Sequence, residues 1–325
     1  MKTRPLYSVH GRDPKGMDPM DLVELVDPPH AQGDVKLLRA RDELRAALAP
    51  ARREGSSIGL VPTMGCLHEG HLSLLRAARA ECDLVVMSLF VNPTQFGVGE
   101  DLDRYPRDEE RDLRLAAEAG ADLVYAPSVE EVYPAGFATH VEVGGLAEVL
   151  CGDPSRRGPE HFRGVTTVVA KLFNSVQPDV AYFGQKDAQQ VAVIRRMVRD
   201  LDVPVRIEAL PTVREADGMA MSSRNAYLDE AARERATALS RALRAAEAAA
   251  GAGEGLARAL ERARAELDAA GVEPEYLEAR DAEDLTPATE LHGGPVLIAV
   301  AAQVGGARLI DNVELRGDRE RGAGT

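Results

Sequence analysis

Two histidines three residues apart are the strongest chemical signal in the chain. They lie in PTMGCLHEGH (62–71), which follows the apolar run SIGLV (57–61). The pattern predicts a strand, a glycine-containing loop and the start of a helix. Backbone N–H groups at a helix start lack partners and attract phosphate, and His68 and His71 would share one helix face there as donors. A zinc site is not favoured, because HEGH lacks the HExxH spacing.

Two more polar groups directly follow apolar runs that predict strands. Asn92 and Gln95 lie in FVNPTQF, and their uncharged amides offer both donors and acceptors to a hydroxy acid. Lys186 and Asp187 lie in YFGQKDAQQ, where the lysine is a mobile cation and the aspartate is a candidate helix cap or magnesium ligand. Gln190 lies four residues after Lys186, on the same predicted helix face.

A fourth segment combines hydroxyl groups with a guanidinium. Ser222, Ser223 and Arg224 follow an Asp-Gly turn in PTVREADGMAMSSRN, and this combination suits a triphosphate. A competing phosphate motif fails, because GRDPKG (11–16) has the glycine spacing of a P-loop but is followed by Met17 instead of lysine.

Alternating strands and helices must position these side chains. Strands are predicted at 57–61, 84–91, 121–126, 179–183 and 203–210, and helices at 35–53, 70–81, 108–119, 165–176 and 188–201. This alternation predicts an α/β fold with a doubly wound parallel sheet, whose ligands lie at the carboxyl ends of the strands. After about residue 212, two helices within 230–267 and strands at 276–279, 295–302 and 307–313 predict a smaller α+β unit.

Composition excludes several classes of protein. The 325-residue chain has a formal net charge of −14 and no basic stripe, which argues against a nucleic-acid partner. No apolar run approaches the ~20 residues that span a bilayer, so no membrane association is expected. The three cysteines are far apart, as is typical of reduced thiols in a cytoplasmic protein. Residues 1–33 are predicted to be a loosely ordered extension.

Six segments together resemble one family in order and spacing. They are PTMGCLHEGH, FVNPTQF, YPR, HFRGVTTVVAKLF, YFGQKDAQQ and PTVREADGMAMSSRN. Over residues 34–315 they are similar to the pantothenate synthetase (pantoate–β-alanine ligase) family of the HxGH nucleotidyltransferase superfamily. The resemblance implies a Rossmann-like domain at 34–212 that binds ATP and pantoate, a smaller C-terminal lid domain at 213–325, and a homodimer.

The same resemblance implies an activity. The family condenses (R)-pantoate with β-alanine through a pantoyl-adenylate, and it converts ATP to AMP and pyrophosphate with Mg²⁺ as a cofactor. A chain that resembles it is expected to be a carbon–nitrogen ligase. Two alternatives remain open from the residues alone: another nucleotidyltransferase, such as a cytidylyltransferase or a tRNA-charging enzyme, and a non-catalytic regulator that binds a nucleotide.

The resemblance also implies roles for individual residues. The nucleotide site would comprise Met64, Gly65, His68, His71, Gly184, Lys186, Asp187, Val213, Met221, Ser222, Ser223 and Arg224. Of these, His68, His71, Lys186, Ser223 and Arg224 are expected to act in catalysis. Gln95 and Gln190 match the pantoate-binding glutamines, with Pro62 and Asn92 beside them. The protein ligands of Mg²⁺ stay open within the acidic stretch Asp108, Glu109, Glu110, Arg111 and Asp112.

Overall fold

The computed structural model describes residues 35–97, 99–291 and 294–316, which all belong to one structural unit, Asp34–Thr325. The extension predicted at residues 1–33 lies outside the described residues. None of the described helices is long and apolar enough to cross a membrane.

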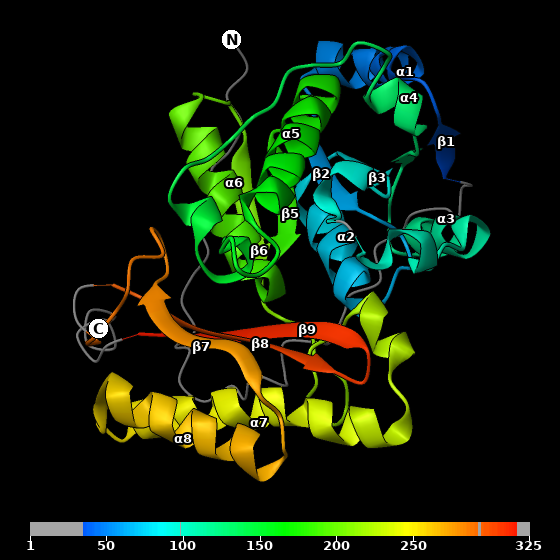
Figure 1. The fold of residues 1–325 in the computed structure, drawn as a ribbon. Coiled ribbons are helices and arrows are strands. Elements are labelled where there is room, and N and C mark those ends of the chain that lie inside the picture. The colour runs from blue at the N-terminus through cyan, green and yellow to red at the C-terminus, as the bar shows by residue number, and fades with distance from the viewer. Residues whose placement is uncertain (1–34, 98, 292–293, 317–325) are drawn as a thin grey trace, which may run out of the picture. The chain divides into compact units, whose positions relative to one another are not determined.

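A six-stranded parallel sheet forms the larger layer of the structure (Figure 1). Its strand order is β1-β4-β3-β2-β5-β6. The strands are β1 (Lys36–Leu38), β2 (Ile58–Thr63), β3 (Leu84–Leu89), β4 (Leu123–Tyr125), β5 (Val180–Gly184) and β6 (Arg206–Leu210). Because the chain proceeds from β2 towards β4 on one side and from β5 to β6 on the other, the switch point lies between β2 and β5. Ligands are expected at this point in such sheets.

Helices cover both faces of this sheet. They are α1 (Arg41–Glu54), α2 (Glu69–Glu81), α3 (Glu109–Glu118), α4 (Val129–Val132), α5 (Pro159–Val176) and α6 (Ala188–Asp200). Buried residues of α1, α5 and α6 pack on one face of the sheet, and those of α2 and α3 pack on the other. Neighbouring strand residues such as Leu60 and Val61 point into the two different cores. The predicted doubly wound sheet is confirmed.

The helix predicted at 35–53 is wrong at its start. Lys36–Leu38 form the edge strand β1, which pairs in parallel with β4, and α1 begins only at Arg41. Leu37 and Leu38 pack into the cores on opposite faces of the sheet, which is strand alternation. Helical spacing in the sequence concealed this alternation, because a strand of three residues is too short to show its own period.

The C-terminal part forms a second, antiparallel layer. Its elements are α7 (Glu230–Gly251), α8 (Gly255–Ala269), β7 (Pro274–Asp281), β8 (Val296–Val304) and β9 (Ala307–Leu315), with the strand order β7-β8-β9. One face of this sheet packs on α7 and α8, and the other packs on α6 and the loop around Leu150. The predicted smaller α+β unit is confirmed.

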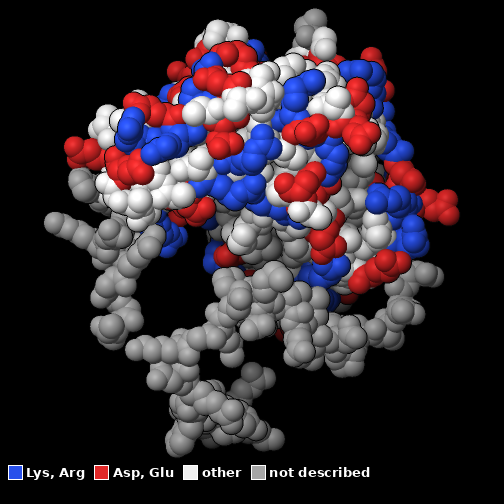
Figure 2. Space-filling model, turned by 90° about the horizontal axis from the view of Figure 1, so that it is seen from below, with Lys and Arg blue, Asp and Glu red and all other residues white. Residues whose placement is uncertain are grey.

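The outer surface of this second layer carries mixed charge. Figure 2 views the molecule from below in the orientation of Figure 1, where α7 and α8 lie lowest. On this face, basic side chains are interspersed with acidic ones. Helix α8 carries ion pairs between neighbouring turns, such as Arg264 with Asp268, at 2.7 Å, and Arg258 with Glu261, at 2.6 Å.

Candidate active site

The four polar segments meet at one cavity beside the carboxyl ends of β2 and β5. All of the predicted site residues except Gly65 line it: Pro62, Met64, His68, His71, Asn92, Gln95, Gly184, Lys186, Asp187, Gln190, Val213, Met221, Ser222, Ser223 and Arg224. Gly65 is buried and does not line the cavity. The structure therefore brings together side chains that are up to about 160 residues apart in the chain.

The two histidines lie at the start of α2 with their ring centroids 4.1 Å apart. The backbone N–H of His68 donates to Nδ1 of His71 at 3.3 Å, so the proton of a neutral His71 ring is on Nε2. Burial, followed by the nearby charge of Lys186, lowers the pKa of His68 to about 4, and burial lowers the pKa of His71 well below its usual value. At neutral pH both rings are thus uncharged hydrogen-bond donors.

A strained loop precedes these histidines. Gly65 has φ of +87°, and a Cβ at this position would lie 2.7 Å from Leu89 Cδ1 and 2.9 Å from Asp112 Oδ2. Cys66 has φ of +51°, which is unusual for a residue with a side chain. Gly65 is needed here for its backbone, and no other residue fits this position without moving a neighbour.

Asp112 holds this loop in place from α3. Its buried carboxylate accepts hydrogen bonds from the backbone N–H groups of Cys66 and Leu67, both at 2.8 Å. The sequence left Asp112 among the open magnesium candidates and did not reveal this role. One signal was present: Asp112 lies on the same face of α3 as the buried Ala116, four residues later, so a carboxylate was placed toward the core.

Two more of the acidic candidates also have structural partners. Asp108 caps α3 by accepting from the N–H of Arg111 at 3.1 Å, and Glu109 forms an ion pair with Arg39 at 2.6 Å. Within the part of the chain that the structure describes, no group of three or more His, Cys, Asp and Glu residues is arranged to hold a metal ion alone. A carboxylate that does line the cavity is Asp187, 3.8 Å from the amine of Lys186.

Asn92 supports the side chain of Gln95. Asn92 is buried, and its amide nitrogen donates to Oε1 of Gln95 and to the carbonyl of Gly164, both at 3.1 Å. Its oxygen accepts from the hydroxyl of Tyr133 at 2.8 Å. The amide nitrogen of Gln95 lies 3.1 Å from the sulfur of Met64. Asn92 therefore orients the glutamine, and its direct contact with a substrate stays a prediction.

His161 and Arg157 were not assigned a role from the sequence. Nδ1 of His161 donates to the carbonyl of Gln95 at 2.7 Å, and Nε2 accepts from Arg157 at 3.2 Å. Burial, then the charge of Arg157, lowers the pKa of His161 to about 3, so this ring is neutral. His161 opens the segment HFRG, but the carbonyl that it binds is distant in the chain and no local pattern revealed it.

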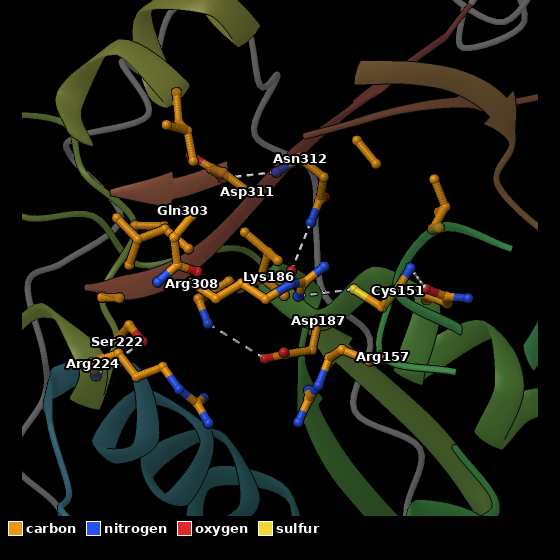
Figure 3. Close-up of a pocket in the computed structure, with 18 of the residues that line it drawn as sticks. Cys151, Arg157, Lys186, Asp187, Ser222, Arg224, Gln303, Arg308, Asp311 and Asn312 are labelled. Atoms are coloured by element: carbon orange, nitrogen blue, oxygen red, sulfur yellow. Dashed lines mark hydrogen bonds and ion pairs between the residues drawn. The ribbon is translucent and has the colours of Figure 1, made fainter. Parts of the chain in front are cut away.

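The small C-terminal sheet holds both cationic segments of the site. Asn312 of β9 donates to the carbonyl of Gln185 at 2.9 Å and to that of Lys186 at 2.8 Å, and Figure 3 shows Asn312 beside Lys186. The adjacent Asp311 binds Arg214 through two hydrogen bonds of 2.7 and 3.0 Å. One strand thus anchors the lysine segment and the loop that carries the serines and Arg224.

Matches to known proteins agree with this geometry. The family model for pantoate-beta-alanine ligase matches residues 36–314. The chain belongs to the pantoate–β-alanine ligase family. A pantothenate synthetase of Moorella thermoacetica is 58% identical over 283 residues, which are 86% of this chain and 99% of that relative. One of Pelotomaculum thermopropionicum is 54% identical over 277 residues, or 84% of this chain and 96% of the relative.

Solved structures of the ligase family have the same fold. Pantothenate synthetase from Thermus thermophilus is 49% identical, has a TM-score of 0.82, and covers 87% of this chain and 100% of its own. The ligase from Francisella tularensis, solved in complex with beta-gamma ATP and beta-alanine, is 31% identical with a TM-score of 0.71 and covers 86% of this chain and 97% of its own. The family, the fold and the ligase class predicted from the sequence are confirmed.

A second cavity adjoins the first in this ligase. Residues that line both cavities are Arg157, His161, Lys186, Asp187, Gln190, Ser222 and Arg224. Figure 3 shows Arg157, Lys186 and Arg224, which come from three separate segments, extending toward the same region beneath β9. The three cations form a shared wall between the two cavities.

Proposed function

We propose that this ligase condenses pantoate with β-alanine in the first cavity, and that ATP activates the pantoate carboxylate as an adenylate. The single observation that carries this proposal is the convergence of the histidine pair, Lys186 and the Ser222–Arg224 loop beside two glutamines at the β2/β5 switch point. The complex of the Francisella tularensis relative with beta-gamma ATP and beta-alanine supports the choice of nucleotide and amine.

The chemistry requires charge to be neutralised. In the first step a carboxylate oxygen of pantoate attacks the α-phosphorus of ATP, the bond to the β-phosphate oxygen breaks, and pyrophosphate leaves. Lys186 and Arg224 would balance the charge that develops on the leaving group, while His68, His71 and Ser223 donate hydrogen bonds to phosphate oxygens. Met64, Gly184, Val213 and Met221 would contact the remainder of the nucleotide.

The second step uses the activated acyl group. The free amine of β-alanine attacks the acyl carbon, AMP leaves with its electron pair, and the amine loses a proton to give the amide. Gln95 and Gln190 would hold the pantoate hydroxyls and carboxylate in line. Among the described residues, the side chain of Gln190 has no hydrogen-bond partner, whereas Asn92 and Met64 hold that of Gln95.

The cavity lining includes apolar side chains that would contact the hydrocarbon part of pantoate. They are Phe90, Val165, Val168, Val169 and Leu172. An acid whose carbon skeleton is branched would bury its methyl groups here, and each buried carbon group contributes about 0.8 kcal/mol.

Magnesium and closure complete the proposal. Mg²⁺ is held largely by phosphate oxygens and water in nucleotide sites, so Asp187, a carboxylate that lines the cavity, would be a sufficient protein contact. The metal would screen the phosphate charge.

Residues 34–212 are proposed as the ATP- and pantoate-binding domain and 213–325 as the lid domain of a homodimer. The cytoplasmic location stays a prediction.

ATP–pyrophosphate exchange tests this function. Exchange is measured with and without pantoate before any β-alanine is added. We expect exchange that depends on pantoate, and pantothenate once β-alanine is present. A nucleotide-binding regulator would show no exchange, and another nucleotidyltransferase would require a different acid. Either result refutes the proposed substrate.

A further inference from the structure

A short segment on the margin of the second cavity packs against the Ser-Ser-Arg loop. It is the 3₁₀ helix η3 (Asp101–Arg104) and the following Tyr105, and it contacts η7 (Ser223–Tyr227). The hydroxyl of Tyr227 donates to the carbonyl of Arg104 at 3.1 Å, and Asp101 forms an ion pair with Arg224. These contacts join the parallel-sheet part of the chain to the loop that carries Arg224.

Asp101 is the charged member of this contact. Its carboxylate accepts from Nε and Nη2 of Arg224, both at 2.9 Å, in a two-pronged ion pair. The side chain of Asp101 is 13% exposed and that of Arg224 is 25% exposed, so the ion pair is largely shielded from water. The ring of Tyr105 lies 5.8 Å from the guanidinium carbon. Two sides of the guanidinium are thus occupied.

The remaining edge of Arg224 is available to a ligand. Nη1 makes no hydrogen bond to any residue that the structure describes, and Arg224 lines both cavities. An arginine whose Nε and Nη2 are bound can still donate two hydrogen bonds through Nη1. An unrestrained arginine side chain loses rotamer entropy when a ligand fixes it, and the ion pair with Asp101 makes this ordering independent of the nucleotide.

We propose that Asp101 is a positioning residue for adenylation: it holds Arg224 by Nε and Nη2 and leaves Nη1 to the phosphates. This inference rests on the proposed function of the adjoining cavity. Asp101 lines the second cavity and not the first, so it acts through the arginine without touching the nucleotide. If Asp101 instead competed with phosphate for Arg224, it would weaken nucleotide binding. The test below distinguishes positioning from competition.

Asp103→Asn provides a matched control for Asp101→Asn. Asp103 lies in the same 3₁₀ helix, is exposed, and makes no hydrogen bond to a described residue. Both variants remove one negative charge near the site, so their difference isolates the ion pair with Arg224. We expect Asp101→Asn to lower kcat/KM for ATP in pantoate-dependent exchange by about tenfold or more, and Asp103→Asn to stay within about twofold. The KM for β-alanine should be unchanged in both.

A double-mutant cycle with Arg224→Lys tests whether Asp101 acts through the arginine. Lysine cannot form the two-pronged pair, so Asp101→Asn should have no further effect in that background. An effect that persists there, unchanged ATP kinetics in Asp101→Asn, or a lower KM for ATP in Asp101→Asn would each overturn the inference. If Asp101→Asn folds poorly by circular dichroism, Asp101→Glu, which keeps the charge but displaces it, serves in the same cycle. Wild-type exchange establishes the function independently.

Discussion

The loop before the histidines should depend on Asp112, a residue that contacts no substrate in the proposed reaction. Replacing Asp112 by Asn keeps the shape of the side chain but leaves one oxygen for two backbone donors, the N–H groups of Cys66 and Leu67, both now 2.8 Å from the carboxylate. The new amide N–H₂ would face one of these donors. A hydrogen bond to a charged group contributes about 1.5–3 kcal/mol, and a buried donor without a partner costs about 1–3 kcal/mol.

The net loss of stability in Asp112→Asn is smaller than the sum of the lost hydrogen bond and the cost of the unpaired donor. Burial raises the pKa of Asp112 even though the two N–H groups oppose this shift, so the fold disfavours the charge that Asn removes. We therefore expect the free energy of unfolding to fall by about 2 kcal/mol. If only the loop before the histidines loosens, this loss of about 2 kcal/mol lowers the fraction of molecules with the loop in its active conformation. Pantoate-dependent exchange would then fall by up to about 30-fold.

Two further variants make the Asp112 experiment specific. Glu110→Gln, an exposed position on the same helix, should change neither stability nor exchange beyond about 0.5 kcal/mol. Cys66→Gly relieves the positive φ of 51° and should recover part of the exchange in the Asp112→Asn background. Denaturant unfolding and ATP–pyrophosphate exchange measure both effects. Wild-type stability together with wild-type exchange in Asp112→Asn would refute the assigned role.

Three other predictions concern the cavity itself. His68→Ala and Lys186→Ala should each lower exchange by about 10²–10³-fold with an unchanged unfolding midpoint, and near-normal turnover would remove that residue from the mechanism. Folding lowers the pKa of His68 to about 4 and lowers that of His71 well below its usual value, so the unfolded chain binds protons at a higher pH than the folded chain. The free energy of unfolding, measured without substrates, should therefore decline as pH falls from about 6.5, and imidazole signals of these two residues that titrate near 6.5 in NMR spectra would contradict this. Asn312→Ala removes the donor to the carbonyls of Gln185 and Lys186, and we expect the KM for ATP to rise about tenfold while the KM for β-alanine is unchanged, as steady-state kinetics would show.

Most elements of the fold could be predicted from the sequence because their signals are local. The apolar run before Pro62 and the periodic stretch 188–201 carry their own strand and helix patterns. The edge strand at Lys36–Leu38 did not, because its conformation depends on pairing with β4, more than 80 residues away. A short strand is stabilised by its neighbour, and its own sequence does not contain that neighbour.

The supporting residues of the site were missed for a related reason. Asp112, His161 and Asp101 act on Leu67, Gln95 and Arg224, which lie 45, 66 and 123 residues away. A carboxylate or an imidazole in a polar stretch has the same local appearance whether it is exposed or buried beneath a loop. Only the packing of α3, α5 and η3 against the cavity distinguishes these side chains from their exposed neighbours.

The sequence by itself determined which chemical groups the site contains and that they follow parallel strands, since residue type and periodicity are properties of neighbouring positions. The tertiary structure alone decided the protonation of His68, the free edge of Arg224 and the second cavity beyond Lys186. These properties arise from burial and from charges on distant segments. Electrostatic energy depends on distance in space and on the surrounding medium, and separation along the chain specifies neither.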